Sequence, residues 1–237
     1  NINQYIGTKY DNKGLITLRA RYAQLTPPWL YNHYQGDIFK WDNSLAKQEY
    51  LIWQADYNYK SLDLGAKYSL IKNFAYFDSL ARPRQFGESF SVIQAFASKN
   101  FQLGKFGFDN NVIFQLSSKD DILPLPNIIA HVNFDFSQSL FKNATVIQPG
   151  VELFYNTAYN GYGYMPVTRS FYVQDAVQTG NYIYADVYLK AKIKRVMMYI
   201  KYRHFNAGML SYDYFMVPHY PMRDATVNFG IRWLFYD

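Results

Sequence analysis

Asp224-Ala-Thr-Val-Asn-Phe-Gly-Ile-Arg-Trp-Leu-Phe-Tyr-Asp237 is the stretch that decides the fold class. In an extended strand its apolar residues share one face: Ala225, Val227, Phe229, Ile231, Trp233 and Phe235. Thr226, Asn228, Gly230 and Arg232 take the other face, and only Leu234 and Tyr236 break the alternation. Strands of soluble proteins are usually about five or six residues long. A strand that crosses a bilayer needs about 9–11 residues, apolar toward lipid, with aromatic residues at the boundary. The stretch therefore predicts the closing strand of a transmembrane β-barrel.

The composition of the chain agrees with a barrel. The 237 residues include 24 Tyr and 19 Phe, yet the mean hydropathy is only −0.27. A barrel gives such an average because half of each strand is polar. No apolar run is long enough for a transmembrane helix. Cys is absent, which excludes disulfides and thiolate metal sites. We expect one domain over residues 1–237.

The charge of the chain does not indicate nucleic acid as a partner. The net charge is +6 and the pI is about 9.2, but the basic residues are scattered and Lys194-Arg195 is the only adjacent pair. A nucleic-acid-binding domain gathers its cations on one face or along a helix. The chain also starts without Met, inside an apparent strand. We therefore expect that an amino-terminal portion of the barrel precedes this sequence.

Segments of alternating polarity recur along the whole chain. They predict about eleven strands, at residues 1–10, 15–22, 49–59, 62–70 with an extension toward 77, 88–98, 106–118, 128–137, 144–155, 183–193, 196–203 and 224–237. Connections near residues 12, 60, 102, 142 and 195 are short, and those near 35, 82, 122, 168 and 216 are mostly longer. Bacterial barrels have short periplasmic turns and long external loops. The pattern predicts an all-β, antiparallel up-and-down transmembrane barrel.

Two features qualify this prediction. Single-chain bacterial barrels have even strand numbers, so an odd count indicates a larger barrel or one misassigned strand. Proline cannot donate to a sheet ladder. Every proline except Pro149 falls in a long connection, including Pro83, and Pro149 therefore predicts a bulge or an error in its strand.

The polar face of the strands supplies the candidate pore lining. By strand parity it carries the cations Arg19, Arg21, Lys67, Lys190, Lys192, Lys201, Arg203 and Arg232, the anions Asp56, Asp63, Asp135, Glu152 and Asp186, and His131. Charges that line a pore bias which ions pass. The surplus of cations predicts a mild preference for anions. The alternative is that these charges pair across neighbouring strands and only stabilise a wet interior.

Aromatic residues fall into two groups. The outward-facing ones predict an interfacial girdle: Tyr22, Tyr57, Tyr59, Tyr202, Trp233 and Phe235. The others lie in the long connections: Trp29, Tyr31, Tyr34, Phe39, Trp41, Tyr162, Tyr164, Tyr212 and Tyr214. They could stack on sugars, narrow the lumen or contact another outer-membrane protein. They could equally pack on one another and order the loops, because aromatic content alone does not separate these roles.

Enzyme chemistry and cofactors are not predicted. The histidines His33, His131, His204 and His219 are dispersed and none has metal-ligand spacing. Barrel phospholipases place Ser two residues after a His, whereas Asn133 and Asn206 follow His131 and His204 here. Asp120-Asp121 could bind a hard cation, although adjacent loop carboxylates are usually solvated.

Several motifs resemble the porin family of Bacteroidetes. They are Pro28-Trp29-Leu30-Tyr31-Asn32-His33-Tyr34, then Asp37 with Trp41-Asp42-Asn43, Gly180-Asn181-Tyr182, Ile193-Lys194-Arg195, Tyr220-Pro221, and Phe229 through Asp237. The similarity covers most of the chain, as the carboxyl-terminal part of a longer family member. The resemblance implies an outer-membrane porin-like barrel, and it implies no substrate or binding residue.

The sequence thus predicts a passive pore for small hydrophilic solutes in the outer membrane of a Gram-negative bacterium. We expect outer-membrane lipid around it and the loops after Gln24 and Thr157 at its mouth. Two alternatives stay open. One is a structural or assembly subunit in an outer-membrane secretion or uptake complex, and the other is a soluble β-sandwich.

Overall fold

A computed structural model shows an all-β protein built on one large antiparallel sheet. It describes residues 2–10, 13–209, 214–233 and 235, with side chains from residue 13 onward. Eleven strands follow one another across the sheet, and a short twelfth, β10, pairs with β11. The sheet strands are β1 (Ile2–Tyr10), β2 (Gly14–Leu25), β5 (Gln48–Tyr59), β6 (Leu62–Phe77), β7 (Pro83–Leu103), β8 (Phe106–Ser117), β9 (Ile128–Phe136), β10 (Gln138–Leu140), β11 (Thr145–Asn156), β14 (Tyr182–Ile193), β15 (Val196–Arg203) and β18 (Thr226–Trp233).

The long connections contain small elements of their own. These are α1 (Trp29–Asn32) with the hairpin β3 (His33–Gln35) and β4 (Lys40–Asp42), the hairpin β12 (Gly163–Met165) and β13 (Ser170–Tyr172), and the hairpin β16 (Phe215–Val217) and β17 (Tyr220–Pro221). None of the described helices is long and apolar enough to span a membrane.

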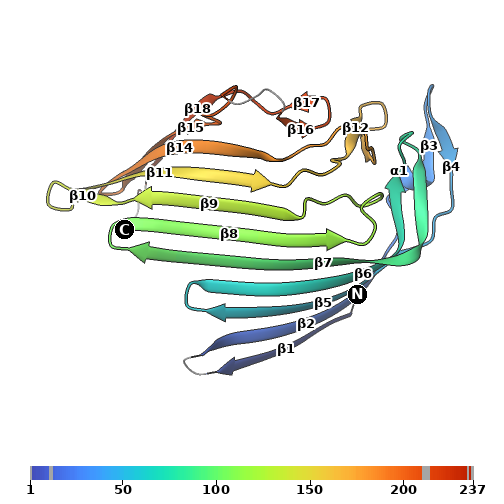
Figure 1. The fold of residues 1–237 in the computed structure, drawn as a ribbon, viewed down its shortest axis with the longest axis horizontal. Helices are drawn as coiled ribbons and strands as arrows, with labels where there is room; N and C mark the ends of the chain where they lie inside the picture. Colours follow the sequence, from blue (N-terminus) through green and yellow to red (C-terminus); the bar gives the residue numbers. More distant parts are fainter. Residues whose placement is uncertain (1, 11–12, 210–213, 234, 236–237) are drawn as a thin grey trace.

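Short and long connections lie at opposite ends of the sheet (Figure 1). The tight turns β5–β6, β7–β8 and β14–β15 gather at one end, which we call the turn end. The connections that hold α1, β12 and β16 gather at the other, which we call the loop end. Each long strand pairs with its sequence neighbour in antiparallel register. The predicted up-and-down antiparallel topology is therefore confirmed.

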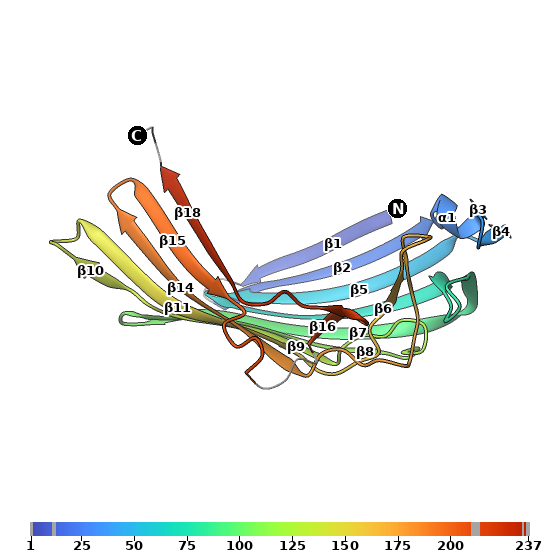
Figure 2. The ribbon, with the colours of Figure 1, turned by 90° about the horizontal axis from the view of Figure 1, so that it is seen from above.

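The sheet is curved and open (Figure 2). It forms a trough with β1 at one edge and β18 at the other, and these two strands do not pair with each other. Both edge strands run from the loop end to the turn end. The predicted closing strand is present as β18, while residues 234, 236 and 237 lie outside the described residues.

The β6–β7 hairpin is longer than the sequence predicted. Residues around Pro83 were expected to form a loop, but Pro83 begins β7 and pairs with Phe77. Proline is tolerated as the first residue of a strand. The register shifts between Lys72 and Phe74, where Asn73 has a left-handed backbone with φ of 56°. This bulge lets the hairpin continue beyond the rest of the sheet, so the expected loop is only residues 78–82.

Two smaller expectations were also wrong. The short connection expected near residue 102, between strands at 88–98 and 106–118, is confined to Gly104 and Lys105, because Leu103 still pairs with Phe106. Pro149 neither breaks nor bulges β11, since it pairs in register with Leu189. The irregularity lies in the neighbouring strand. The pairing of β9 with β11 stops at Gly150 and resumes through β10 at Ile147, so the missing proline N–H faces that break.

Candidate functional site

The pairing register puts the predicted charged residues on one face of the sheet, which we call the polar face. Across it, Arg19 lies opposite Gln54 and Gln54 opposite Lys67. Further along, Asp135 lies opposite Gly150, Glu152 opposite Asp186, and Tyr188 opposite Lys201. The same parity holds for each of the others: Arg21, Asp56, Asp63, His131, Lys190, Lys192, Arg203 and Arg232.

The opposite face is apolar, and the described part of the chain leaves much of it exposed. Ile128 is 40% exposed, Ile231 is 69% exposed and Phe229 is 80% exposed. The register places Tyr22, Tyr57, Tyr59, Tyr202 and Trp233 on this apolar face as well. Phe235 follows β18 and stacks on Trp233, with ring centroids 5.4 Å apart. An exposed apolar surface of this size marks a site of contact with a membrane or with another protein.

The largest charge cluster on the polar face surrounds Lys201. Its ammonium contacts the Glu152 carboxylate and lies 2.9 Å from Asp186 Oδ2. Asp186 is buried, accepts the backbone N–H of His204 at 2.7 Å, and has Arg203 Nε 3.9 Å away. One lysine thus joins carboxylates from two other strands.

A second ion pair lies at the other side of the sheet. Arg19 Nη1 is 3.3 Å from Asp56 Oδ2, and the Gln54 amide donates to Asp56 Oδ1 at 2.8 Å. Asp56 is buried while the Arg19 side chain is 46% exposed. The arrangement supplies the buried carboxylate with both a counter-charge and a donor.

Ion pairing does not cancel the positive charge of the predicted set. Asp56, Glu152 and Asp186 are paired, whereas Asp63 accepts from Asn58 and Asp135 from Gln148, which are neutral amides. Within the described part of the chain, five cations of the set take part in no ion pair: Arg21, Lys67, Lys190, Lys192 and Arg232. Lys190 instead lies over the Tyr188 ring, 4.3 Å from its centroid. The pairing alternative therefore applies to some of these residues and not to others.

Side chains converge on the polar face. The Tyr188 hydroxyl on β14 reaches across β11 and donates to Asn133 Oδ1 on β9 at 2.9 Å. Rings also cover glycines of neighbouring strands: a Cβ on Gly65 would lie 2.0 Å from Phe96, and one on Gly150 would lie 2.3 Å from Tyr188. Convergence of this kind indicates the concave side of a curved sheet. The polar face therefore lines the inside of the trough.

A loop folds onto this face at the loop end. Ile122, in the connection between β8 and β9, is buried against Ile71, Phe90 and Val92. The register of β6 and β7 places these three residues on the polar face. Tyr162, from the connection after β11, donates its hydroxyl to the Ile122 carbonyl at 3.0 Å, and burial raises the pKa of this hydroxyl. Two connections thus meet over the polar face at the loop end.

The sequence did not identify the Ile122 loop as a mouth element. It pointed to the connections after Gln24 and Thr157, and the second of these does contact the Ile122 loop through Tyr162. The sequence does contain an indication of this role, because an apolar run lies within this connection: Ile122-Leu123-Pro124-Leu125-Pro126. Val92 and Phe96 are apolar residues on the polar face of β7, so the sequence of this strand does not alternate clearly between polar and apolar residues.

The aromatic residues of the first long connection pack on one another. Tyr34 stacks on Trp41 with centroids 4.9 Å apart, and Phe77 at the β6–β7 tip contacts both Trp41 and Tyr31. The Tyr34 hydroxyl donates to the Val167 carbonyl at 3.2 Å and so joins this group to the β12–β13 hairpin. These contacts favour the loop-ordering role. Trp29 contacts the His33 ring, with centroids 5.5 Å apart, but stays 71% exposed. Tyr212 lies outside the described residues.

The histidines are not gathered into a site. His204 is fully buried. Its Nδ1 donates to the Arg223 carbonyl (2.6 Å), and its Nε2 lies at hydrogen-bond distance from the Tyr182 hydroxyl (2.8 Å). It therefore attaches the last long connection to the sheet. His131 is exposed on the polar face between Asn111 and Phe154. Among the described residues, no three His, Cys, Asp or Glu side chains are close enough to hold a metal ion.

Comparison with known families decides the identity of this two-faced sheet. A family model described as "Putative porin" matches residues 1–237. The chain belongs to this porin family. No curated protein matches it. The family is consistent with an outer-membrane β-barrel, and the open antiparallel sheet fits the wall of one.

Proposed function

We propose that this porin chain forms the wall of an outer-membrane pore through which small hydrophilic solutes diffuse passively. The observation that carries the proposal is the division of one sheet into an uncovered apolar face and a concave polar face. Strands β2, β5, β8, β11 and β14 each contain 12 residues. That length suffices for a bilayer crossing of about 9–11 residues. Membership of the porin family supports the same function.

Lumen width is the first selection that we propose. Barrels of about eight strands are filled by their side chains, whereas about 16–18 strands leave an aqueous channel. The eleven strands of this open sheet already exceed the filled class. The Ile122 loop would then reduce the cross-section at the loop end, where it packs on the polar face.

Lining charge is the second selection, and it supports a mild preference for anions. Arg21, Lys67, Lys192 and Arg232 lie on the polar face without an ion pair among the described residues. Low-dielectric walls focus the field of such charges on passing ions. The unpaired cations, rather than the paired ones, would therefore set the selectivity.

Single-channel recording in planar bilayers tests both parts. We expect steady stepwise conductance and, in a salt gradient, a reversal potential of the sign that small anions produce. Lys192→Glu should move that potential toward cation selectivity, because it reverses an unpaired lining charge. A cation-selective wild-type pore would refute the anion preference and leave the pore itself intact.

The structural or assembly role is the second candidate, and exposed apolar side chains at the loop end favour it. Trp29, Ile38 and Met216 are each at least 66% exposed. Where such side chains form a contiguous apolar patch, they mark a surface on which a partner protein docks. A folded barrel that shows no conductance and co-purifies with envelope proteins would support this role over the pore.

A further inference from the structure

Lys99 is a charged residue within the apolar face of the sheet. In the strands that the structure describes from β2 onward, the register places three charged residues on this face: Glu49, Lys72 and Lys99. Glu49 and Lys72 lie opposite each other at the edge of the face nearest the loop end. Lys99 instead has apolar neighbours on both sides along β7, Ala97 toward the loop end and Phe101 toward the turn end. It is exposed and takes part in no ion pair among the described residues.

The position of Lys99 in its strand places it inside the apolar band. β7 continues to Leu103, and Phe101 stacks on Phe108 with ring centroids 4.8 Å apart, so apolar side chains extend beyond Lys99 toward the turn end. With a rise of about 3.3 Å per residue and a tilt of about 40°, Lys99 lies about 10 Å from that end of the strand along the membrane normal. A charge at this depth on a lipid-facing wall destabilises the protein, and such residues therefore usually have a functional partner.

A hydrogen-bond donor lies beside the lysine. Asn110 on β8 pairs directly with Lys99, so both side chains belong to the same face. Leu62 and Val132 continue this row on the strands to either side, and the two polar residues are thus surrounded by apolar ones. An ammonium and an amide NH₂ group on neighbouring strands together fit an anionic group such as a phosphate.

An apolar hollow begins beside this polar pair. It has a volume of about 630 Å³ and includes Ala97 and Val112, which are the next residues of the apolar face from Lys99 and Asn110 toward the loop end. Ligand pockets typically have volumes of about 300–1,000 Å³. The hollow leads away from the turn end and therefore toward the middle of the bilayer.

Three alanines form the floor of the hollow. Ala55, Ala66 and Ala95 pair in register on β5, β6 and β7, where their small side chains leave space between larger neighbours. A second hollow of about 450 Å³ shares these alanines and continues past Trp53 and Tyr68 toward the loop end. The two hollows together form a groove along the apolar face, and an apolar, flexible acyl chain can follow it.

We propose that this site binds an anionic phospholipid, with the phosphate at Lys99 and Asn110 and one acyl chain in the groove. The short turns of bacterial barrels face the periplasm, so the lipid belongs to the periplasmic leaflet. The lysine side chain is long enough to extend its ammonium toward the membrane boundary, where the phosphate lies. The site rests on the membrane-facing orientation of the apolar face in the proposed function, and it goes beyond that function because it does not involve the lumen.

Two other occupants fit less well. A neutral lipid would fill the groove but would leave the Lys99 ammonium without a counter-charge. A second copy of the chain offers Glu49 as the anion of the apolar face in the described strands. Copies inserted in the same direction place Glu49 near the loop end, on the other side of the membrane from Lys99. Charge complementarity therefore favours an anionic lipid.

Native mass spectrometry of the full chain in detergent tests the proposal, with phosphatidylglycerol as the probe. Phosphatidylcholine with the same acyl chains is the comparison, because its own ammonium group balances its phosphate. Lys99→Gln removes the charge, and Lys142→Gln is the matched control, since Lys142 is exposed in the turn between β10 and β11. Ala66→Leu fills the groove, and Ala191→Leu is its control on the apolar face of β14, outside both hollows.

We expect the wild type and both controls to retain phosphatidylglycerol in preference to phosphatidylcholine. Lys99→Gln should lower the affinity for phosphatidylglycerol about tenfold, and Ala66→Leu should weaken the binding of both lipids. Unchanged phosphatidylglycerol affinity in either variant, with the heat-modifiable gel shift retained, would overturn the proposal. Equal binding of the two lipids by the wild type would also overturn it.

Conductance separates this site from the pore function. A wild type that shows the lipid preference but no conductance would refute the pore and support the lipid site. Conductance without a lipid preference would refute the lipid site and leave the pore intact.

Discussion

Replacing Lys201 with Met removes the one cation that joins Glu152 and Asp186. The Asp186 side chain is only 6% exposed, so the change leaves a buried carboxylate without its nearest counter-charge. Breaking a fully buried pair costs about 3–5 kcal/mol, and an exposed pair contributes about 0–1 kcal/mol. Lys201 and Glu152 are 24% and 30% exposed, which places this cluster between the two cases. We therefore expect a loss of about 2–3 kcal/mol in the free energy of unfolding.

Equilibrium unfolding in urea, followed by tryptophan fluorescence in lipid vesicles, measures this loss. Lys192→Met is the matched control, because Lys192 has the same charge, lies on the same face and has no ion pair among the described residues. It should change stability by less than about 0.5 kcal/mol. Asp186→Asn added to Lys201→Met should recover part of the loss. Equal effects of the two lysine variants would refute the reasoning that pairing, rather than charge alone, stabilises this face.

Three further predictions concern a glycine of the sheet, the Ile122 loop and the β6–β7 tip. Gly150→Ala should destabilise the sheet by about 1–3 kcal/mol in the same urea assay, because the Tyr188 ring lies where the new Cβ would be. Gly87→Ala should cost less, since its Cβ would meet only one atom, at 4.0 Å. Ile122→Ala empties a buried contact and should raise single-channel conductance as its loop loosens; an unchanged conductance would remove this loop from the proposed mouth.

The third prediction concerns pH and the β6–β7 tip. Burial opposes ionisation of Asp78, but hydrogen bonds from the Arg82 and Leu80 backbone and the Arg84 side chain outweigh it and hold the Asp78 pKa below its ordinary value. The carboxylate therefore stabilises the tip above its ordinary pKa, and that contribution is lost as the pH falls through the lowered pKa. In the wild-type protein, the Leu80 and Arg82 amides should lose protection against hydrogen exchange as the pH falls, because Asp78 becomes protonated. In Asp78→Asn the protection of these amides should not show this loss. Identical pH profiles of protection in the two proteins would contradict the prediction.

Much of the sheet could be predicted because polar and apolar residues alternate within the sequence of each strand. Residues 183–193 alternate strictly, and β14 spans Tyr182–Ile193 with that parity. The faces of β7 were harder to predict, because two apolar residues, Val92 and Phe96, lie on its polar face. The first packs on Ile122, and the second covers Gly65. Both reasons are contacts with distant residues, and a strand's own sequence does not contain them.

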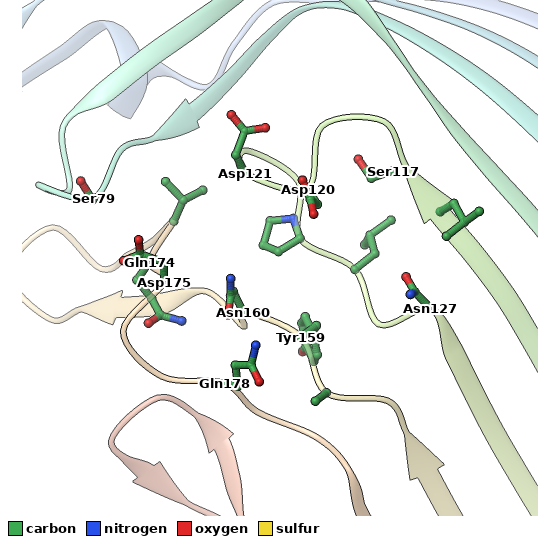
Figure 3. Close-up of a pocket in the computed structure, with 15 residues that line it drawn as sticks. Ser79, Ser117, Asp120, Asp121, Asn127, Tyr159, Asn160, Gln174, Asp175 and Gln178 are labelled. Carbon is green, nitrogen blue, oxygen red and sulfur yellow. The ribbon is translucent and has the colours of Figure 1, made fainter.

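The site was predictable only in part for a similar reason. Parity identified which charges share a face, but pairing depends on which strands are neighbours. Lys201 and Glu152 are separated by β14, so their contact follows from register and curvature together. Asp120, Asp121 and Asp175 line one hollow at the loop end, although they come from connections that are distant in the sequence (Figure 3). Asp120-Asp121 was visible as a pair, whereas Asp175 and Asn160 had no signal linking them to it.

The direction of the two edge strands restricts how this wall can become a ring. β1 and β18 point the same way, so bringing them together directly would create a parallel seam within an otherwise antiparallel sheet. If every neighbouring pair of strands in a closed barrel is antiparallel, an odd number of additional strands must lie between β1 and β18. The resulting total is even, as in bacterial single-chain barrels. Mass spectrometry of cross-links between cysteines introduced on the two margins would distinguish direct joining from an inserted segment.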